Sequence, residues 1–221
     1  DGDDELAFDA LTNLKKKIAS NPDIVTFNFN AVLNNKKKIY ARKDFLKIKR
    51  KKTELIKNFL SGDIDGSVIF TCFKKKFLTE NSIKFPKGLH EDIVFIFKSY
   101  LFASKIVKFN KILYIKNEVK NSITGTISKK RINDLMNIHL KLIKILKQYK
   151  YYRSYMLTFA KKGFVGYVAD TIKDVKKETK INQNLKKKIL SMILIKSLKF
   201  PGINQYNYLT KKDFVFKKFI D

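Results

Sequence analysis

The order of hydrophobic and polar positions predicts a region of mixed strands and helices at the start of the chain. Apolar residues recur at helical spacing over residues 6–18, with lysines at the solvent end, which predicts a helix that stops at Asn21-Pro22. Its apolar positions are Leu6, Ala10, Leu11, Leu14 and Ile18. Residues 23–29 (DIVTFNF) are β-branched and aromatic in alternation, which is typical of a strand. After a turn at residues 34–35, residues 38–41 are expected to return as its partner.

The next part of the chain predicts further short elements. Residues 53–60 have a helical pattern with Thr53 as the cap, and residues 61–66 read as a loop. Residues 93–103 are apolar on almost every side, so this helix must be buried. Residues 105–109 and 112–116 predict two short strands that form a hairpin-like pair around Asn110-Lys111.

The pattern changes after Gly125 and becomes helical. Long amphipathic helices are predicted over residues 132–146, 164–179 and 185–198, whereas residues 206–220 have no clear period. The fold class predicted from the pattern is therefore α/β to α+β over residues 1–128, followed by a mostly helical, Lys-rich extension over residues 129–221.

Composition narrows the class of protein. Hydrophobic residues make up 44% of the chain, with 19 Phe and 10 Tyr, which is ample for a packed core. The lone Cys72 excludes an internal disulfide and suits a reducing cytosol. The longest apolar run, residues 189–195, ends at Lys196 and is far shorter than the roughly 20 residues that span a bilayer. A cytoplasmic protein is expected, with peripheral contact to the inner face of the plasma membrane as a further expectation.

The net charge of +28 raises the question of a polyanionic partner. Nearly all of this charge is lysine, whereas base recognition favours arginine, so no specific nucleic-acid partner is expected. Attraction to anionic lipid headgroups remains. Lys186, Lys187 and Lys188 begin a basic amphipathic helix that could lie on an anionic membrane. The alternative, a helix packed on the rest of the protein, is equally consistent with the pattern.

Two clusters of carboxylates are candidates for chemistry. Asp1, Asp3 and Asp4 form an acidic turn that suits Mg²⁺ or Mn²⁺, ions that often bridge to a phosphate. A calcium loop is rejected because Leu6 and Thr12 stand where Gly and Glu are required. Helix capping explains the cluster equally well.

The second cluster is Glu91-Asp92, at the start of the apolar helix. A carboxylate there could act as a general base, with helix capping as the alternative. His90 is a candidate third polar group, and His139 is expected to be an ordinary surface or packing residue.

Taken together, the two clusters and the sequence between them resemble a family 2 glycosyltransferase of the GT-A (Rossmann-like) fold. The opening DGDDEL and the strand NPDIVTFNF are similar to the middle of such a domain, and residues 73–124 are similar to its second half. The matching positions, in order, are Phe77-Leu78, Glu80-Asn81, Phe85, Gly88, Glu91-Asp92, Leu113-Tyr114 and Asn121-Ser122-Ile123-Thr124. The resemblance covers residues 1–128.

The resemblance implies roles for the acidic residues. Asp1 and Asp3 stand at the DxD positions that hold a divalent metal (Mn²⁺ or Mg²⁺) with the ribose and diphosphate of a nucleotide-sugar donor, expected to be a UDP-sugar. Asp4 supports them. Asp92 stands at the position of the general base, with Glu91 as accessory carboxylate. The implied reaction is an inverting transfer to an acceptor hydroxyl in surface polysaccharide or lipid-linked glycan synthesis.

One departure from the family is expected to matter. The nucleotide-binding half that precedes the DxD turn in this family has no counterpart here, so the chain resembles a fragment whose activity in isolation is in doubt. The competing hypothesis is a non-enzymatic basic module that binds anionic membrane or nucleic acid.

Overall fold

The structure is a computed structural model of the 221-residue chain, and it describes residues 2–33, 36–40, 52–64, 66–117, 127–149 and 154–201. Its strands are β1 (Glu5–Leu6), β2 (Ile24–Leu33), β3 (Lys36–Tyr40), β4 (Thr71–Phe73) and β5 (Ile106–Asn117). Its helices are α1 (Ala10–Ile18), α2 (Lys52–Leu60), α3 (Lys75–Glu80), α4 (Glu91–Phe102), α5 (Lys129–Gln148), α6 (Ser154–Lys177) and α7 (Gln183–Leu198). The predicted segments 34–35, 206–220 and residue 41 lie outside the described residues.

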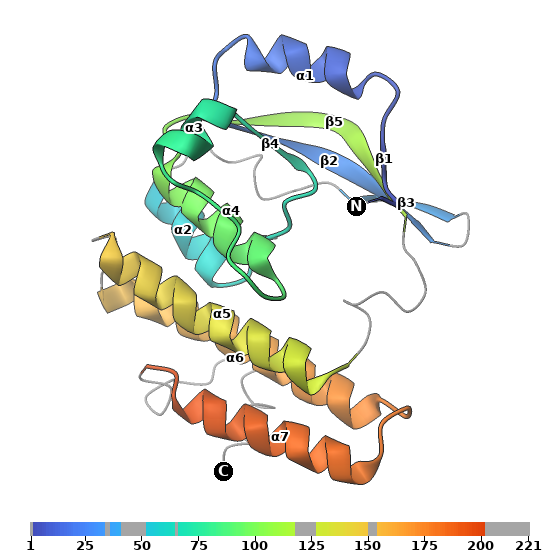
Figure 1. The fold of residues 1–221 in the computed structure, drawn as a ribbon, viewed down its shortest axis with the longest axis vertical. Coiled ribbons are helices and arrows are strands. Elements are labelled where there is room, and N and C mark those ends of the chain that lie inside the picture. Colours follow the sequence, from blue (N-terminus) through green and yellow to red (C-terminus); the bar gives the residue numbers. More distant parts are fainter. Residues whose placement is uncertain are drawn as a thin grey trace.

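Within the described residues the strands form one mixed sheet of order β1-β5-β2-β3, with β4 also paired to β2 (Figure 1). The central pair, β2 and β5, is parallel, and every other pairing is antiparallel. The amino-terminal end of this pair is fixed by Asp23, whose carboxylate accepts hydrogen bonds from the backbone N–H groups of Ser104 (2.7 Å) and Lys105 (3.0 Å). The predicted strand at residues 23–29 and its returning partner are confirmed.

The predicted hairpin at residues 105–116 is wrong, because this segment is the single strand β5. It pairs with β2 along nearly its whole length, and the register jumps from Phe27↔Phe109 to Asn28↔Ile112. Asn110 and Lys111 are therefore absorbed as a bulge, which bends the strand and leaves its direction unchanged.

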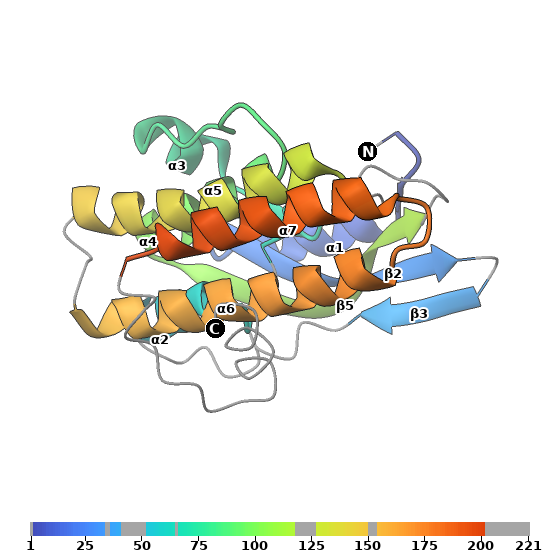
Figure 2. The same ribbon diagram turned by 90° about the horizontal axis from the view of Figure 1, so that it is seen from below.

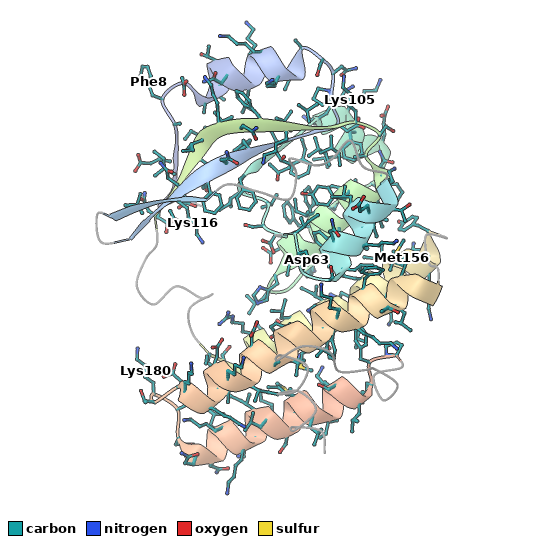
Figure 3. All side chains as sticks on the ribbon, turned by 180° about the vertical axis from the view of Figure 1, so that it is seen from behind. Phe8, Asp63, Lys105, Lys116, Met156 and Lys180 are labelled. Atoms are coloured by element: carbon teal, nitrogen blue, oxygen red, sulfur yellow. The ribbon has the colours of Figure 1, made fainter. Side chains whose placement is uncertain are left out.

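The sheet carries α1 on one face (Figure 1). A small buried cluster of Ala10, Phe27, Phe70 and Leu113 lies beneath this helix. The helix begins at Ala10 and not at Leu6. Leu6 belongs to β1 and pairs with Tyr114 of β5. The predicted apolar stripe is only partly buried, since Leu11 is 71% exposed and Ile18 is 49% exposed. Phe8 is fully exposed at the corner between β1 and α1 (Figure 3).

The other face of the sheet is covered by α4, which is buried as its sequence predicts. Seven of its side chains are buried, among them Phe95, Phe97 and Tyr100. Rings from several elements surround it: Phe73 of β4 and Phe85 contact Phe95, and Phe59 of α2 contacts both Phe97 and Tyr100. The buried Ser99 hydroxyl donates to the Phe95 carbonyl oxygen (2.9 Å), so burial leaves that hydroxyl satisfied.

The helices α5, α6 and α7 form a further layer on the far side of α4 (Figures 1 and 2). Their buried side chains belong to the same hydrophobic cluster as those of α2 and α4. The predicted helices over residues 53–60, 132–146, 164–179 and 185–198 are thus confirmed, although α2 begins one residue before Thr53, its predicted cap. Of the described helices, none is long and apolar enough to cross a membrane.

Helix α6 approaches α2 most closely at Gly163. A Cβ atom placed at Gly163 would lie 2.1 Å from the carbonyl oxygen of Leu60, at the last residue of α2. Only glycine fits a backbone contact this close. The contact fixes the position of the helical layer against α2.

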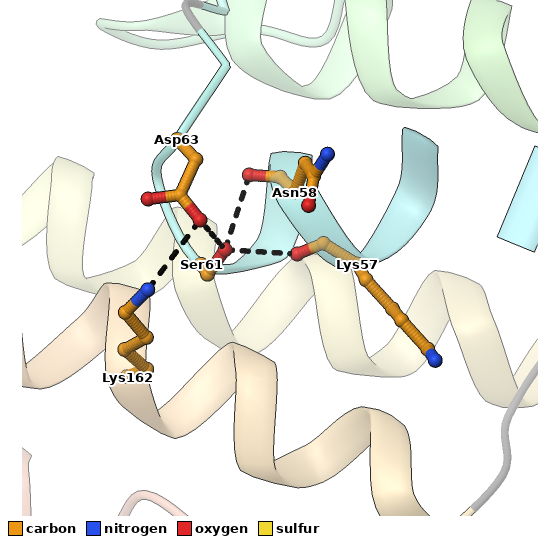
Figure 4. Close-up of polar contacts among 5 residues, drawn as sticks. All are labelled: Lys57, Asn58, Ser61, Asp63 and Lys162. Atoms are coloured by element: carbon orange, nitrogen blue, oxygen red, sulfur yellow. Dashed lines mark hydrogen bonds and ion pairs between the residues drawn. The ribbon is translucent and has the colours of Figure 1, made fainter. Parts of the chain in front are cut away.

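A polar cluster lies beside this contact (Figure 4). The Ser61 hydroxyl lies 2.5 Å from Asp63 Oδ2, and the same carboxylate oxygen lies 3.4 Å from Lys162 Nζ of α6. Both charged side chains are about half exposed, at 53% and 51%. Such exposed pairs contribute at most about 1 kcal/mol, so Gly163 and the apolar core hold the two helices together.

We expect Gly163→Ala to destabilise the protein by at least about 2 kcal/mol, although alanine in a helix interior is otherwise favoured over glycine by about 1 kcal/mol. Chemical denaturation measures the change. Gly66→Ala is the matched control, because its Cβ would meet the Ile93 side chain at 3.2 Å and a side chain can move aside. Equal stability of the two variants would contradict the close contact.

His139 is a packing residue in this layer, as the sequence predicts. Its ring lies 5.5 Å from the rings of both Phe164 and Tyr167 of α6. Burial among these groups lowers the pKa of His139 to about 4. The imidazole is therefore neutral in the folded protein at neutral pH.

We expect acid to weaken the fold through His139. In the unfolded chain His139 has its ordinary pKa of 6.5, whereas in the folded chain its pKa is about 4. Between these pH values only the unfolded chain binds the proton. The free energy of unfolding is therefore highest above pH 6.5 and falls as the pH is lowered toward 4. The loss from pH 6.5 to pH 5 is about 2 kcal/mol. Urea unfolding at both pH values should show this loss in the parent protein and a smaller one in His139→Leu. His90→Asn, which alters the only other histidine, should reduce the loss less than His139→Leu does, because His90 is less buried although its pKa is also lowered.

Candidate active site

The acidic turn is held at the carboxyl end of β5 by the side chain of Asp4. Its Oδ2 accepts a hydrogen bond from the Tyr114 hydroxyl (2.6 Å), and its Oδ1 accepts from the backbone N–H of Asn117 (2.8 Å). Both carboxylate oxygens are thus engaged with one strand. Asp4 acts as a clamp between the turn and the sheet.

Asn117 completes this clamp from the last position of β5. Its side-chain amide donates to the backbone carbonyl of Asp3 (2.7 Å) and to Glu5 Oε1 (3.2 Å). The Asp3 carboxylate itself is exposed, whereas Asp1 lies outside the described residues. The turn therefore presents Asp3 to solvent while its backbone is fixed.

The position of Tyr114 in this clamp also changes the pKa of its hydroxyl. Burial raises the pKa of its hydroxyl, and the hydrogen bond to Asp4 and the negative charges of Asp4 and Asp3 raise the pKa further. Tyr114 is therefore a neutral donor at any physiological pH, and the bond to Asp4 persists across that range.

The carboxylates of the turn fit a divalent metal only if a substrate supplies some of its ligands. Among the residues that the structure describes, no group of three or more His, Cys, Asp or Glu side chains could hold a metal ion. Mg²⁺ is usually held by one or two protein carboxylates, with water and substrate phosphates as its other ligands. An exposed Asp3 beside a clamped Asp4 fits that kind of site.

Glu91 and Asp92 lie in the first turn of α4, and both are partly buried. Asp92 Oδ1 accepts a hydrogen bond from the backbone N–H of Ile93 (2.9 Å), so it takes part in capping the helix. Carboxylates at this end are stabilised by the helix dipole. Asp92 therefore takes part in helix capping, which was the alternative to a catalytic role. Capping does not exclude a second role for this side chain.

Topology places both acidic clusters toward the same end of the sheet. Only residues 103–105 separate the end of α4 from the start of β5, so α4 runs antiparallel to β5 (Figure 1). The first turn of α4 therefore points toward the carboxyl end of the parallel pair, where Asp3 and Asp4 are held. In open α/β sheets, ligands bind at this end.

His90 lies on the side of α4 that faces α5. It precedes the helix with a left-handed backbone (φ 61°), and its Nε2 is buried without a hydrogen-bond partner among the described residues. Burial lowers the pKa of His90, the positive charge of Arg131 adds to this lowering, and Glu91 and Asp134 oppose it. The charges that act on His90 thus include Arg131 and Asp134 of α5.

The lysines predicted to face a membrane divide into two groups. Lys186 Nζ donates to the backbone carbonyl of Lys176 in the last turn of α6 (3.2 Å), and its role at a membrane stays a prediction. Lys187 and Lys188 are exposed and line a groove between α7 and the start of α5.

Comparison with known proteins gives matches of structure and none of sequence. No family model matches the sequence, and neither does any curated protein. The fold is similar to that of residues 1–349 of S. aureus TarS, a glycosyltransferase. In its complex with UDP-GlcNAc the TM-score is 0.57 at 12% identity, over 99% of this chain and 64% of that one. Two further structures of the same TarS residues, one of them a complex with UDP, give TM-scores of 0.54 and, for the UDP complex, 0.53, also at 12% identity.

This likeness establishes the fold. The chain has a mixed α/β fold with a curled mixed sheet that matches the glycosyltransferase fold, which confirms the predicted fold class. It spans 64% of the length of the TarS structure that holds UDP-GlcNAc.

Sequence reasoning missed two residues of the site, Tyr114 and Asn117. Tyr114 was noted as part of a strand, and Asn117 received no role. The available signal is weak: an asparagine at the end of the strand segment LYIKN. Their partners lie more than 100 positions away in the chain, and no local pattern reports such a contact.

We expect Tyr114→Phe to cost about 1.5 to 3 kcal/mol in unfolding free energy, because it removes a hydrogen bond to a charged acceptor. A double-mutant cycle with Asp4→Asn checks the cause. In the Asp4→Asn background the same tyrosine change should cost clearly less. Strictly additive losses would show that the two side chains do not interact.

Proposed function

We propose that the chain is the acceptor-side part of a nucleotide-sugar glycosyltransferase, which moves a sugar from a UDP-sugar to a hydroxyl of a surface or lipid-linked glycan. The observation that carries the proposal is the acidic turn, fixed by Asp4, Tyr114 and Asn117 at the carboxyl end of the parallel strands. The fold likeness to TarS, with structures that hold UDP-GlcNAc and UDP, supports a UDP-sugar donor. Membership of family 2 is part of the same proposal.

The proposed arrangement assigns the donor and the acceptor to different residues. The acidic turn faces the diphosphate, and the first turn of α4 faces the acceptor. Residues 1–128 form the catalytic region, and residues 129–221 form a helical extension that shares its core.

The proposed reaction is one in-line displacement that inverts the anomeric carbon. Asp92 takes the proton of the acceptor hydroxyl, and the acceptor oxygen forms its bond to the anomeric carbon. The bond from that carbon to the nucleoside diphosphate breaks, and its electron pair leaves with the diphosphate. Glu91, one residue earlier, points about 100° away around the helix and is therefore an accessory group.

A bound Mn²⁺ or Mg²⁺ would neutralise the charge that develops on the leaving diphosphate. Asp3, together with Asp1, would hold it. In this arrangement Asp4 contributes by fixing the turn, since both of its oxygens already accept hydrogen bonds from β5.

We expect Asp92→Asn in the intact protein to lower the turnover of UDP-GlcNAc at least about 100-fold, because general-base catalysis typically contributes this much or more. Radiolabelled sugar transfer measures turnover, and calorimetry measures UDP binding, which should persist. Glu91→Gln is the matched control and should retain most of the activity.

The donor side is tested by Asp3→Asn. This variant should weaken UDP binding in Mn²⁺ while leaving the unfolding free energy unchanged, because the Asp3 carboxylate is exposed. Full turnover by Asp92→Asn would remove Asp92 as the base. Absence of any UDP binding by the intact protein would refute the transferase proposal.

A further inference from the structure

A groove of about 450 Å³ lies between α7 and the first turn of α5. Met192 and Ile195 line it, and none of its described lining residues is acidic. The positive side chains around it are Lys129, Lys187, Lys188, Lys196 and Lys199. Lys196 is fixed there, since its Nζ donates to Asn137 Oδ1 of α5 (2.7 Å).

The outward face of α7 combines Lys187, Lys188 and Lys199 with exposed aliphatic side chains. Successive helix positions differ by 100°, so the exposed positions from Lys187 to Lys199 fall within an arc of about 120°. Ile195 and Leu198 lie in this arc, and each is 57% exposed. The buried Ile189 and Ile193 lie on the opposite side of the helix and hold it to the protein. We name this surface the α7 face.

We propose that the α7 face docks on an anionic lipid bilayer. The lysines would meet the phosphates of the headgroups, and Ile195 and Leu198 would enter the boundary between headgroups and acyl chains. The α7 face is on the outer side of the helical layer, on the far side of the molecule from α1 (Figures 1 and 2). No other described helix or strand lies beyond α7 on this side (Figure 1).

The exposed aliphatic side chains decide between a bilayer and a soluble polyanion. Phosphates of a free polymer would be bound by the lysines alone, and exposed isoleucine and leucine would add nothing. Binding of single-stranded nucleic acid relies on aromatic rings that stack on bases, and none of the described residues that line the groove is aromatic. A second copy of the chain is disfavoured because the chain carries a net charge of +28.

The test is co-sedimentation of the full chain with vesicles of phosphatidylcholine, with and without about 30% phosphatidylglycerol, in about 0.1 M salt. We expect binding only to the anionic vesicles. Lys187→Glu with Lys188→Glu should lower the partition coefficient at least about 25-fold, since each basic side chain near the surface contributes about fivefold. Ile195→Ser with Leu198→Ser should lower it on the order of tenfold without any change in charge.

The matched control is Lys15→Glu with Lys16→Glu on α1, which makes the same change in net charge on the opposite side of the molecule. It should lower binding far less than the pair on α7. Equal losses in the two lysine pairs would mean general attraction by charge and would overturn the proposal. Undiminished vesicle binding by the aliphatic variant would overturn it too, and would indicate a site for a soluble polyanion such as polyphosphate. The measurement involves neither donor nor transfer, so its outcome is independent of the proposed reaction.

Discussion

The arrangement of the chain depends on the need to cover α4 on every side. This helix, EDIVFIFKSYLF, has seven buried side chains, so no single layer can remove its apolar surface from water. The sheet covers one side, α2 covers another through Phe59, and the layer of α5, α6 and α7 lies beyond. One hydrophobic cluster consequently extends from β2 to α7, and the helical extension cannot separate from the sheet region without exposing α4. The Gly163 contact then sets how closely the extension approaches.

The same helix gives the candidate site its geometry. Its carboxyl end leads within three residues into β5, and so its polar first turn is directed toward the carboxyl end of the parallel pair. The acidic turn reaches that end independently, through the hydrogen bonds of Asp4 and Asn117. Two acidic clusters about 90 positions apart in the chain are thereby brought toward one edge of the sheet. Neither cluster is distinctive alone, because each also serves a local purpose: Asp4 anchors a turn, and Asp92 caps a helix.

Much of this fold could be predicted from the sequence because its helices and its central strand have strong periodic patterns. The failures occur where long-range contacts override local signals. Asn110-Lys111 has the pattern of a turn, yet the chain continues in the same direction as a bulge paired to β2. Leu6 fits a helix, yet it pairs with Tyr114. The acidic candidates were found through their order along the chain, whereas Tyr114 and Asn117 take their roles from contacts in the folded state.

The lysines show why composition alone is a poor guide to function. A net charge of +28 distributes lysine over almost every surface, so a basic side chain by itself distinguishes no partner. The surfaces differ in what accompanies the charge. On α1 and just before it, Leu11, Ile18 and Phe8 are exposed, whereas on α7 Ile195 lies in a groove bordered by five lysines. Solvated lysine needs no aliphatic neighbour, and an apolar contact surface needs no lysine. Their coincidence in one groove is the feature that a bilayer surface, apolar within and anionic at its boundary, would explain.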